Sequence, residues 1–461
     1  MTTARTHICA LMITLVAACG TDRPHPAWTY ASIPSDPQRA GDPAKGYDYL
    51  INGGYITCGI PKTAYDQVFG NPPVADKIDG RTGDNKNLPF YYSAAKSSEG
   101  VTVISANCLT CHASHLDGEV VVGLGSTDHD FTVDQSQYVD YATNLVSDPA
   151  EQAELQRFST RLHAIGPFTK TLTVGANPAD NLTAVLMAHR DPQTLAWLDT
   201  PALDVPPADE VAPVDVPPWW RMAKKTTMFY GAAGRGDHAR IMMAASLLCT
   251  DSVDEAKQID AAFVDVRAWI ETLQAPKWPY AIDGDLAAKG QSVFEATCAR
   301  CHGTYGDGGS YPNELVPLDD VGTDALLATG STQFAAPYVA WFASSFWGAV
   351  SRLEPQQGYI APPLDGIWAS APYFHNGSVP TLDAVLDSTK RPAAWKRSFD
   401  SSDYDQTGGG WNFTVTPSHA EQPDPRVYDT AEPGYANSGH VFGDGLSATD
   451  RAAVLEYLKT L

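Results

Sequence analysis

Two short segments of the chain carry the same pattern of two thiols and one imidazole. Residues 108–112 read CLTCH and residues 298–302 read CARCH. At this spacing two thiols reach the two vinyl groups of a porphyrin and form thioethers, and the histidine that follows offers its imidazole to the iron. A redox-active dithiol or half of a zinc site is the alternative, but a zinc site needs four ligands and two separate His-terminated copies fit it poorly. We therefore expect two covalently bound haem c groups. The expected thioether cysteines are Cys108, Cys111, Cys298 and Cys301, and the expected proximal ligands are His112 and His302.

Four of the eight cysteines lie outside these motifs. Cys9 and Cys19 belong to the N-terminal segment, which leaves Cys58 and Cys249 as an even pair. In an exported protein such a pair can form a disulfide. The alternative is two buried free thiols that pack as small apolar side chains.

The N-terminus has the features of an export signal. Arg5 and His7 precede a short apolar run over residues 8–16, which is too short to cross a bilayer. The run ends in small residues before Cys19 and resembles the lipobox of bacterial lipoproteins, in which the cysteine is acylated; an ordinary signal cleaved nearby is the alternative. We expect a signal peptide over residues 1–18, a lipid on Cys19 and a periplasmic or cell-envelope location. Residues 19–42 are rich in proline and are expected to form a tether.

Composition narrows the range of partners. The 461 residues carry a net charge of -23, which argues against nucleic acid and anionic lipid surfaces as partners. No apolar stretch of about 20 residues follows the N-terminal segment, so we expect membrane contact only through the lipid anchor. The remaining partners are a small electron-donor protein or a small-molecule oxidant.

Helical periodicity surrounds the second motif. Residues 286–294 place apolar residues at helical spacing and lead directly into Cys298. Residues 447–461 form another amphipathic pattern, in which Ser447 and Asp450 suit an N-terminal capping box. A further helix is expected over residues 261–273, before two prolines.

These elements predict a mainly α fold with two cytochrome c-like haem domains and long irregular loops. We expect the N-terminal haem domain over residues 43–278 and the C-terminal cytochrome c domain over residues 279–461. Residues 199–218 are rich in proline and acidic residues and are expected to form an extended loop within the first domain.

The sixth iron ligand of the second haem can be narrowed by elimination. All seven methionines lie at or before Met243, so the second domain offers no thioether of its own. Its remaining histidines are His375, His419 and His440, and we expect one of them to complete a bis-His iron with a lower potential than a His/Met site. For the first haem, the histidine and methionine candidates are too numerous to choose among.

Residues 230–240 read YGAAGRGDHAR, the most unusual stretch in the first half. Arg235 and His238 are candidates to polarise an O–O bond and to move its proton, as a peroxidase pocket requires. The alternative is that Asp237 caps a helix that begins at His238.

The second half resembles a known superfamily. Residues 361–368 (APPLDGIW) and 371–382 (APYFHNGSVPTL) are similar to the signature of the bacterial dihaem cytochrome c peroxidases, and most similar to the dihaem rubber-oxygenase-like branch. The resemblance implies that His440, in a Gly-His context, is the sixth ligand of the second haem, whereas His375 is structural. It also implies that Phe229 lines the open side of the first haem.

In that superfamily the N-terminal haem meets the oxidant and the C-terminal haem relays electrons, with an aromatic residue between them. Trp219 and Trp220 are the possible equivalents here. The resemblance therefore implies an oxidoreductase that activates peroxide or dioxygen at the first haem. The alternatives are a non-catalytic dihaem electron carrier and a haem-based binding or sensing lipoprotein.

Overall fold

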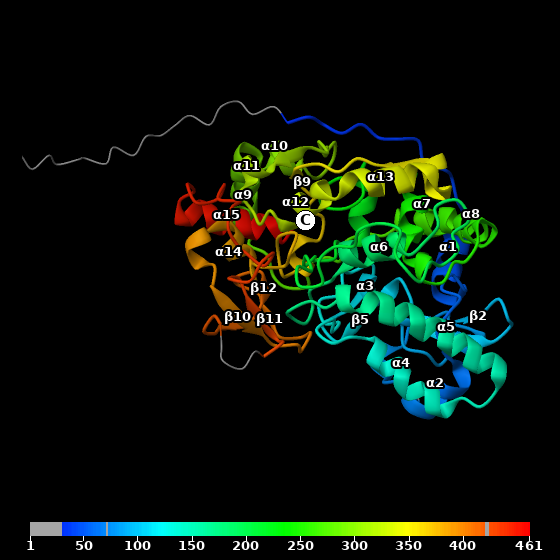
Figure 1. Cartoon of the computed structure of the whole chain (residues 1–461). Helices are drawn as coiled ribbons and strands as arrows, with labels where there is room; N and C mark the ends of the chain where they lie inside the picture. The colour runs from blue at the N-terminus through cyan, green and yellow to red at the C-terminus, as the bar shows by residue number, and fades with distance from the viewer. Residues whose placement is uncertain (1–29, 71, 420–423) are drawn as a thin grey trace, which may run out of the picture.

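The computed structural model describes residues 30–70, 72–419 and 424–461 (Figure 1). The expected signal peptide and Cys19 lie outside the described residues. The prediction of a mainly α fold is wrong, because about 40% of the chain is helical and 13% lies in strands that form several small sheets. The fold is therefore mixed α/β. Helical periodicity predicts helices joined by loops, but many of the expected loops pair with one another as strands of two to five residues.

The helices vary from one turn to five. Their bounds are α1 (Pro43–Asn52), α2 (Lys62–Phe69), α3 (Leu109–His112), α4 (Ser136–Ala142), α5 (Pro149–Ile165), α6 (Ala179–Ala188), α7 (His238–Met242), α8 (Val253–Ile270), α9 (Gly284–Thr297), α10 (Ala299–His302), α11 (Leu318–Val321), α12 (Leu326–Gln333), α13 (Ala335–Ser344), α14 (Leu382–Leu386) and α15 (Ala448–Leu458).

The strands are short throughout the described residues. Their bounds are β1 (Ile60–Pro61), β2 (Tyr92–Lys96), β3 (Thr102–Ala106), β4 (Ala113–Leu116), β5 (Glu119–Val122), β6 (Gly234–Gly236), β7 (Leu315–Pro317), β8 (Ser351–Leu353), β9 (Gly358–Ile360), β10 (Ala394–Arg397), β11 (Tyr404–Asp405), β12 (Gly410–Trp411), β13 (Phe413–Val415) and β14 (Val427–Asp429).

Two packed helices and one small sheet frame the first motif. The Asp42 side chain accepts a hydrogen bond from the Ala44 amide and so caps α1, which packs against α8. The sheet has the order β1-β3-β2, with Ile104 of β3 opposite Ile60 and Ala94. Strand β3 leads through a tight turn into α3, which carries the first motif.

The helices expected around the second motif are present. Helix α9 begins after Asp283, whose side chain accepts from the Leu286 amide, and runs directly into α10 with the second motif. The Ser447 side chain caps α15 by accepting from the Asp450 amide, as the capping pattern predicted. Helices α9 and α15 pack against each other at the left of Figure 1. The helix expected over residues 261–273 is the C-terminal part of α8, and residues 199–218 contain no helix or strand apart from an isolated bridge at Val214.

The two halves of the chain share packing. Strand β6 pairs with β8, and the Trp341 indole of α13 donates to the Arg190 carbonyl, so residues beyond 279 contribute to the core of the first half. Residues 30–42, the described part of the expected tether, also contact this body. Within that segment Arg39 pairs with Asp237 and Asp260 at 2.8 and 2.6 Å.

Cys58 and Cys249 form a disulfide, which answers the question that the sequence left open. The bond joins residues 191 positions apart. Beside it Arg161 donates to the Leu248 and Cys249 carbonyls and pairs with Asp251 at 2.6 Å. The disulfide and this ion-pair cluster together tie the segment before β1 to the start of α8.

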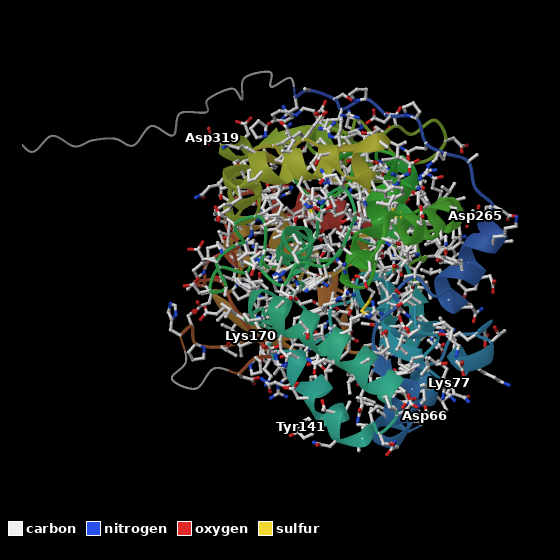
Figure 2. The ribbon with its side chains drawn as sticks, turned by 45° about the vertical axis from the view of Figure 1, so that its right-hand side comes forward. Asp66, Lys77, Tyr141, Lys170, Asp265 and Asp319 are labelled. Atoms are coloured by element: carbon white, nitrogen blue, oxygen red, sulfur yellow. A yellow bond between two sulfur atoms is a disulfide. The ribbon has the colours of Figure 1, made fainter. Side chains whose placement is uncertain are left out.

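Charged side chains such as Asp66, Lys77 and Asp265 lie around the edge of the molecule (Figure 2). Among the described residues, none of the helices combines the length and the apolar character needed to cross a membrane.

Candidate functional site

The first motif is held by a turn before α3. The Asn107 side chain accepts from the Leu109 amide at 2.8 Å and donates to the Phe90 carbonyl at 2.9 Å, which fixes the start of the helix. Cys108 and Cys111 are free thiols and remain partly exposed. Burial raises the pKa of Cys108 to about 12 and also raises that of Cys111, so both thiols are protonated at neutral pH. Two unoxidised thiols on one helical turn are what attachment to two vinyl groups requires.

His112 stands at the end of the same turn. Burial lowers its pKa to about 4, which keeps the imidazole neutral and able to act as a ligand. Its ring stacks on Trp219, with ring centroids 4.6 Å apart and 22° between the planes. Its Nδ1 atom is buried without a hydrogen-bond partner. These features fit a proximal ligand whose orientation is set by stacking.

The imidazole of the second motif is held by a hydrogen bond, unlike the Nδ1 atom of His112. Cys298 and Cys301 are free and partly exposed, and His302 follows them at the end of α10. The His302 Nδ1 atom lies 2.8 Å from the Pro362 carbonyl oxygen. Since a carbonyl only accepts, Nδ1 carries the proton and the Nε2 lone pair is free for a metal, as is usual for metal-binding histidines.

His440 faces His302. Their ring centroids are 6.1 Å apart. Two imidazoles bound to opposite sides of one metal through bonds of about 2 Å place their ring centres roughly 6 Å apart, so the observed separation fits a shared iron. Burial lowers the pKa of His440 to about 3, and its Nδ1 atom has no hydrogen-bond partner. The residues present therefore fit a bis-His haem at the second motif.

The other histidines of the second half have different surroundings. The His375 ring stacks on Tyr359, with ring centroids 4.0 Å apart, and is buried. His419 is exposed and lies beside Asp429 and Glu432. Of the three candidates named from the sequence, only His440 has a ring contact with His302 among the described residues.

The structure places Phe229, Arg235 and His238 on one hairpin-like segment. Met228 bridges to Gly234, and His238 begins α7 directly after β6. Asp237 caps α7 by accepting from the Arg240 amide, so the capping alternative is also observed.

Two members of this segment have unusual environments. The His238 Nε2 atom is buried without a partner, and burial lowers the pKa of His238 to about 4. Phe229 has a left-handed backbone with φ of 68° and is 37% exposed. Arg235 donates from Nε to the Ala232 carbonyl at 2.7 Å and lies 4.0 Å from Glu354. Met228, next in sequence to Phe229, packs in the same hydrophobic cluster as Cys108 and Trp219, which places the segment near the first motif.

A chain of contacts joins the two motif histidines. Trp219, which stacks on His112, is followed by Trp220, whose indole donates to the Asp365 carbonyl at 2.8 Å. Asp365 lies three residues after Pro362, whose carbonyl accepts from His302. The 3₁₀ helix η5 (Trp219–Lys224) holds both tryptophans in this order.

The role of Pro362 is not evident from the sequence. Pro362 belongs to the APPLDGIW motif, but nothing in that pattern indicates that its carbonyl orients His302. Lys225 was also missed: burial lowers the pKa of its amine to about 8, and its charge acts on His238. The second residue of a Lys-Lys pair after a Pro-Trp-Trp segment carries no sequence signal of this kind.

Part of the second half matches a known protein family. Residues 358–396 match the family described as RoxA-like, cytochrome c-like. The matched segment includes Pro362 and His375 and lies after the second motif. The match supports a relationship to rubber-oxygenase-like cytochrome c domains, and such a domain implies covalently bound haem c and a redox role.

Two curated relatives come from Sinorhizobium fredii (strain NBRC 101917 / NGR234). The protein y4iM is 30% identical over 41% of this chain and 48% of its own length. The protein y4iJ is 28% identical over 41% of this chain and 41% of its own length. Both are described as uncharacterized, and this chain spans less than half the length of either.

Proposed function

We propose that the chain is an exported dihaem c-type cytochrome that acts as an oxidoreductase. Peroxide or dioxygen would be activated at the N-terminal haem, and electrons would pass through the C-terminal haem. The observation that carries the proposal is the opposed pair His302 and His440, 6.1 Å apart between ring centroids, beside the free thiols of Cys298 and Cys301. A second CxxCH turn at residues 108–112 supports the same attachment chemistry at the other site.

The haem groups, when bound, supply one-electron chemistry at iron. The two sites differ in what the chain offers to a metal. His302 has an imidazole opposite it, whereas no imidazole ring contacts His112 among the described residues. This difference supports the N-terminal site as the one that meets the oxidant.

Three residues are proposed to serve that site. His238 is neutral at neutral pH and has an unpartnered Nε2 atom, so it can accept a proton from a bound oxidant. Arg235 would supply positive charge toward developing negative charge on oxygen. The exposed ring of Phe229 would line the site and limit access of water.

The relay follows the contacts of η5. Stacked and hydrogen-bonded groups lead from His112 through Trp219 and Trp220 to the Asp365 carbonyl, and from there along the backbone to Pro362 and His302. The same contacts favour one alternative function, a carrier with two six-coordinate haems, because a carrier needs the relay but no reactive site.

The remaining parts of the proposal concern location and partners. A lipid on Cys19 would hold the protein in the cell envelope, consistent with the disulfide between Cys58 and Cys249, because such bonds persist in oxidising compartments. The bacterial dihaem peroxidase superfamily is the proposed wider relationship, and a small electron-donor protein is the proposed partner.

The experiment is a spectrum and a peptide mass analysis of protein from a host that attaches haem c. We expect the peptides that contain Cys108 and Cys298 each to carry the mass of one haem. Cyanide should shift a high-spin component assigned to the first haem and leave a low-spin component unchanged.

The variant H440A should convert the low-spin component to a high-spin one without loss of covalent haem, whereas H419A should leave the spectrum unchanged. Peptides without added mass would contradict haem attachment. Two low-spin haems whose spectra do not change when cyanide is added would favour the alternative function of an electron carrier.

A further inference from the structure

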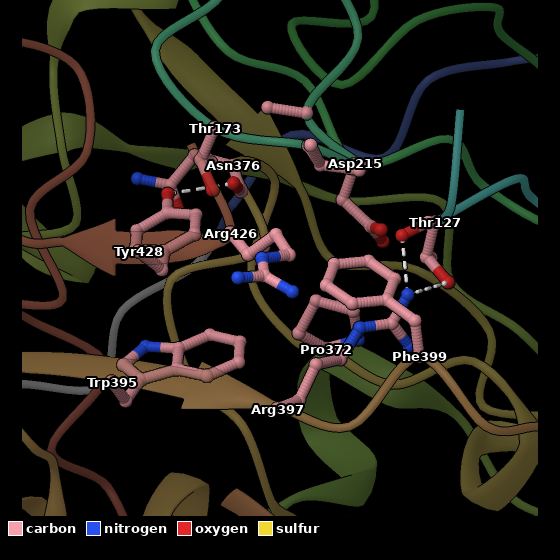
Figure 3. Close-up of a pocket in the computed structure, with 14 residues that line it drawn as sticks. Thr127, Thr173, Asp215, Pro372, Asn376, Trp395, Arg397, Phe399, Arg426 and Tyr428 are labelled. Carbon is pink, nitrogen blue, oxygen red and sulfur yellow. Dashed lines mark hydrogen bonds between the residues drawn. The ribbon is translucent and has the colours of Figure 1, made fainter. Parts of the chain in front are cut away.

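A cavity lies between the two halves of the chain, beside the first motif: its wall residues Thr127 and Ala176 are the chain neighbours of Ser126 and Asn177, which donate to the Cys111 carbonyl and to the Cys111 Sγ atom. Its floor is formed by Thr127 and Asp215 from the first half and by Arg397 from the second, and it has a volume of about 20 Å³ (Figure 3). It continues into a wider cleft of about 760 Å³, which shares Val174, Arg397, Phe399 and Arg426 with it and is open to solvent. The outer volume lies within the range of small-molecule sites, roughly 300–1,000 Å³.

Arg397 is a buried cation with unused hydrogen-bonding capacity. Arg397 is only 8% exposed to solvent. One terminal nitrogen donates to the Thr127 carbonyl and hydroxyl, as the dashed lines in Figure 3 show. Its Nε and its other terminal nitrogen have no hydrogen-bond partner among the described residues, where no carboxylate lies within ion-pair distance of the Arg397 guanidinium. A buried guanidinium with free donors on a cavity wall is suited to accept a carboxylate in its planar fork.

Asp215 does not neutralise this cation. It is also 8% exposed and lines the same cavity, yet no salt bridge joins it to Arg397. Burial raises the pKa of Asp215 well above its usual value, although Arg221 and Arg397 act in the opposite direction. Burial lowers the pKa of Arg397 to about 10, while Asp128 and Asp215 act to raise it, so the guanidinium is positively charged at neutral pH.

The residues that line the wider cleft indicate what chemical group the carboxylate of such a ligand is attached to. Phe399 lies 4.5 Å from the Arg397 guanidinium and gives the cleft an aromatic wall. Asp424 is already held by Lys396 and Arg426 at 2.6 and 3.0 Å, so it adds little free negative charge. Asp128 and Asp130 on the rim repel multiply charged anions, which disfavours phosphate esters.

We propose that this cleft binds a free small molecule that has a single carboxylate and an apolar body, with the carboxylate on Arg397. The same carboxylate chemistry is present in the propionate groups of a porphyrin, and the experiment separates the two sources. The inference does not rest on the proposed oxidoreductase function.

The experiment is titration calorimetry of the purified full chain with benzoate, with benzamide as its neutral analogue and with inorganic phosphate. We expect one benzoate per chain, with benzamide and phosphate at least about tenfold weaker. The variant R397Q should weaken benzoate binding at least about tenfold, because it removes a charge-assisted hydrogen-bonded pair. R352Q is the matched control: Arg352 lies on β8, outside the cleft, and its loss should leave benzoate binding unchanged.

A second variant tests the proposal even if R397Q does not fold correctly. V174W keeps every charge and fills the shared part of the cleft, so it should weaken benzoate while the melting temperature stays near that of the wild type. No benzoate binding, equal binding of benzamide or phosphate, or unchanged binding in both variants would overturn the proposal. A shift of the porphyrin propionate bands in the resonance Raman spectrum of R397Q, without benzoate binding to the wild type, would assign Arg397 to the haem instead.

Discussion

At the scale of single residues, burial decides what each histidine can do. His238, His302 and His440 all have a lowered pKa, and in each case burial is the first cause. A neutral imidazole is a ligand or a base, whereas a protonated one is neither. The sequence located His302 through its motif, but the burial of His238 depends on contacts that no local pattern contains.

The lowered pKa of His238 predicts a loss of stability in acid. The unfolded chain binds a proton at His238 below about pH 6.5, whereas the folded chain binds it only near pH 4, so stability is full above 6.5 and falls as the pH decreases between these values. We expect this residue to contribute roughly 3 kcal/mol to that loss. Urea unfolding over this range should show a shallower loss for H238Q than for the wild type. H163Q, which changes an exposed histidine, should follow the wild type; equal slopes for H238Q and wild type would contradict the assignment.

At the scale of elements, caps and motifs were predictable, but strand pairing was not. Helices α9 and α15 were predicted from their periodicity, and the capping role of Ser447 was predicted from its spacing to Asp450. Strands such as β10 and β14 are only three or four residues long and pair across distant segments, so their own sequences carry little signal. The mixed α/β character of the fold arises from these long-range pairings.

The packing of α9 on α15 depends on a close approach at Gly290. A Cβ atom added there would lie 1.8 Å from the Ala453 carbonyl oxygen. We expect G290A to destabilise the protein by about 1–3 kcal/mol, because the two helices must separate. The control G284A is on the same helix, where an added Cβ meets nothing within 4 Å, and it should not lower the melting temperature. Similar melting temperatures for the two variants would show that the helices do not pack this closely.

At the scale of the whole molecule, the sequence indicates candidate attachment residues but not the arrangement of the fold. The two CxxCH turns and His440 remain predicted haem-binding residues, and the geometry around His302 is compatible with that prediction. The cleft at Arg397 was not foreseen, because its walls come from segments more than 200 residues apart and no local motif marks it. The disulfide was one of two alternatives, because an even number of remaining cysteines allows a pair to form but does not show whether the two sulfur atoms lie close enough to bond.

The disulfide closes a loop that spans residues 58 to 249, and its loss should release much chain entropy on unfolding. We expect the double variant C58S/C249S to be less stable by about 2–5 kcal/mol, as measured by urea unfolding. A reducing agent should lower the stability of the wild type by a similar amount and leave the double variant unchanged. Equal stability of the variant and the oxidised wild type would mean that the Asp251 ion pairs alone hold these segments.

The segment over residues 30–42 sets an order of events during synthesis. Arg39 is made long before Asp237 and Asp260, and Ser32 is made long before Pro312, to whose carbonyl its hydroxyl donates. The Arg39 contacts therefore form only after more than half of the 461-residue polypeptide exists, and the Ser32 contact only after about two thirds of it exists, so the earliest part of the described chain reaches its native place late. Both CxxCH turns have been synthesised by the time Ser32 can reach Pro312, so this last contact closes over a body whose attachment sites already exist.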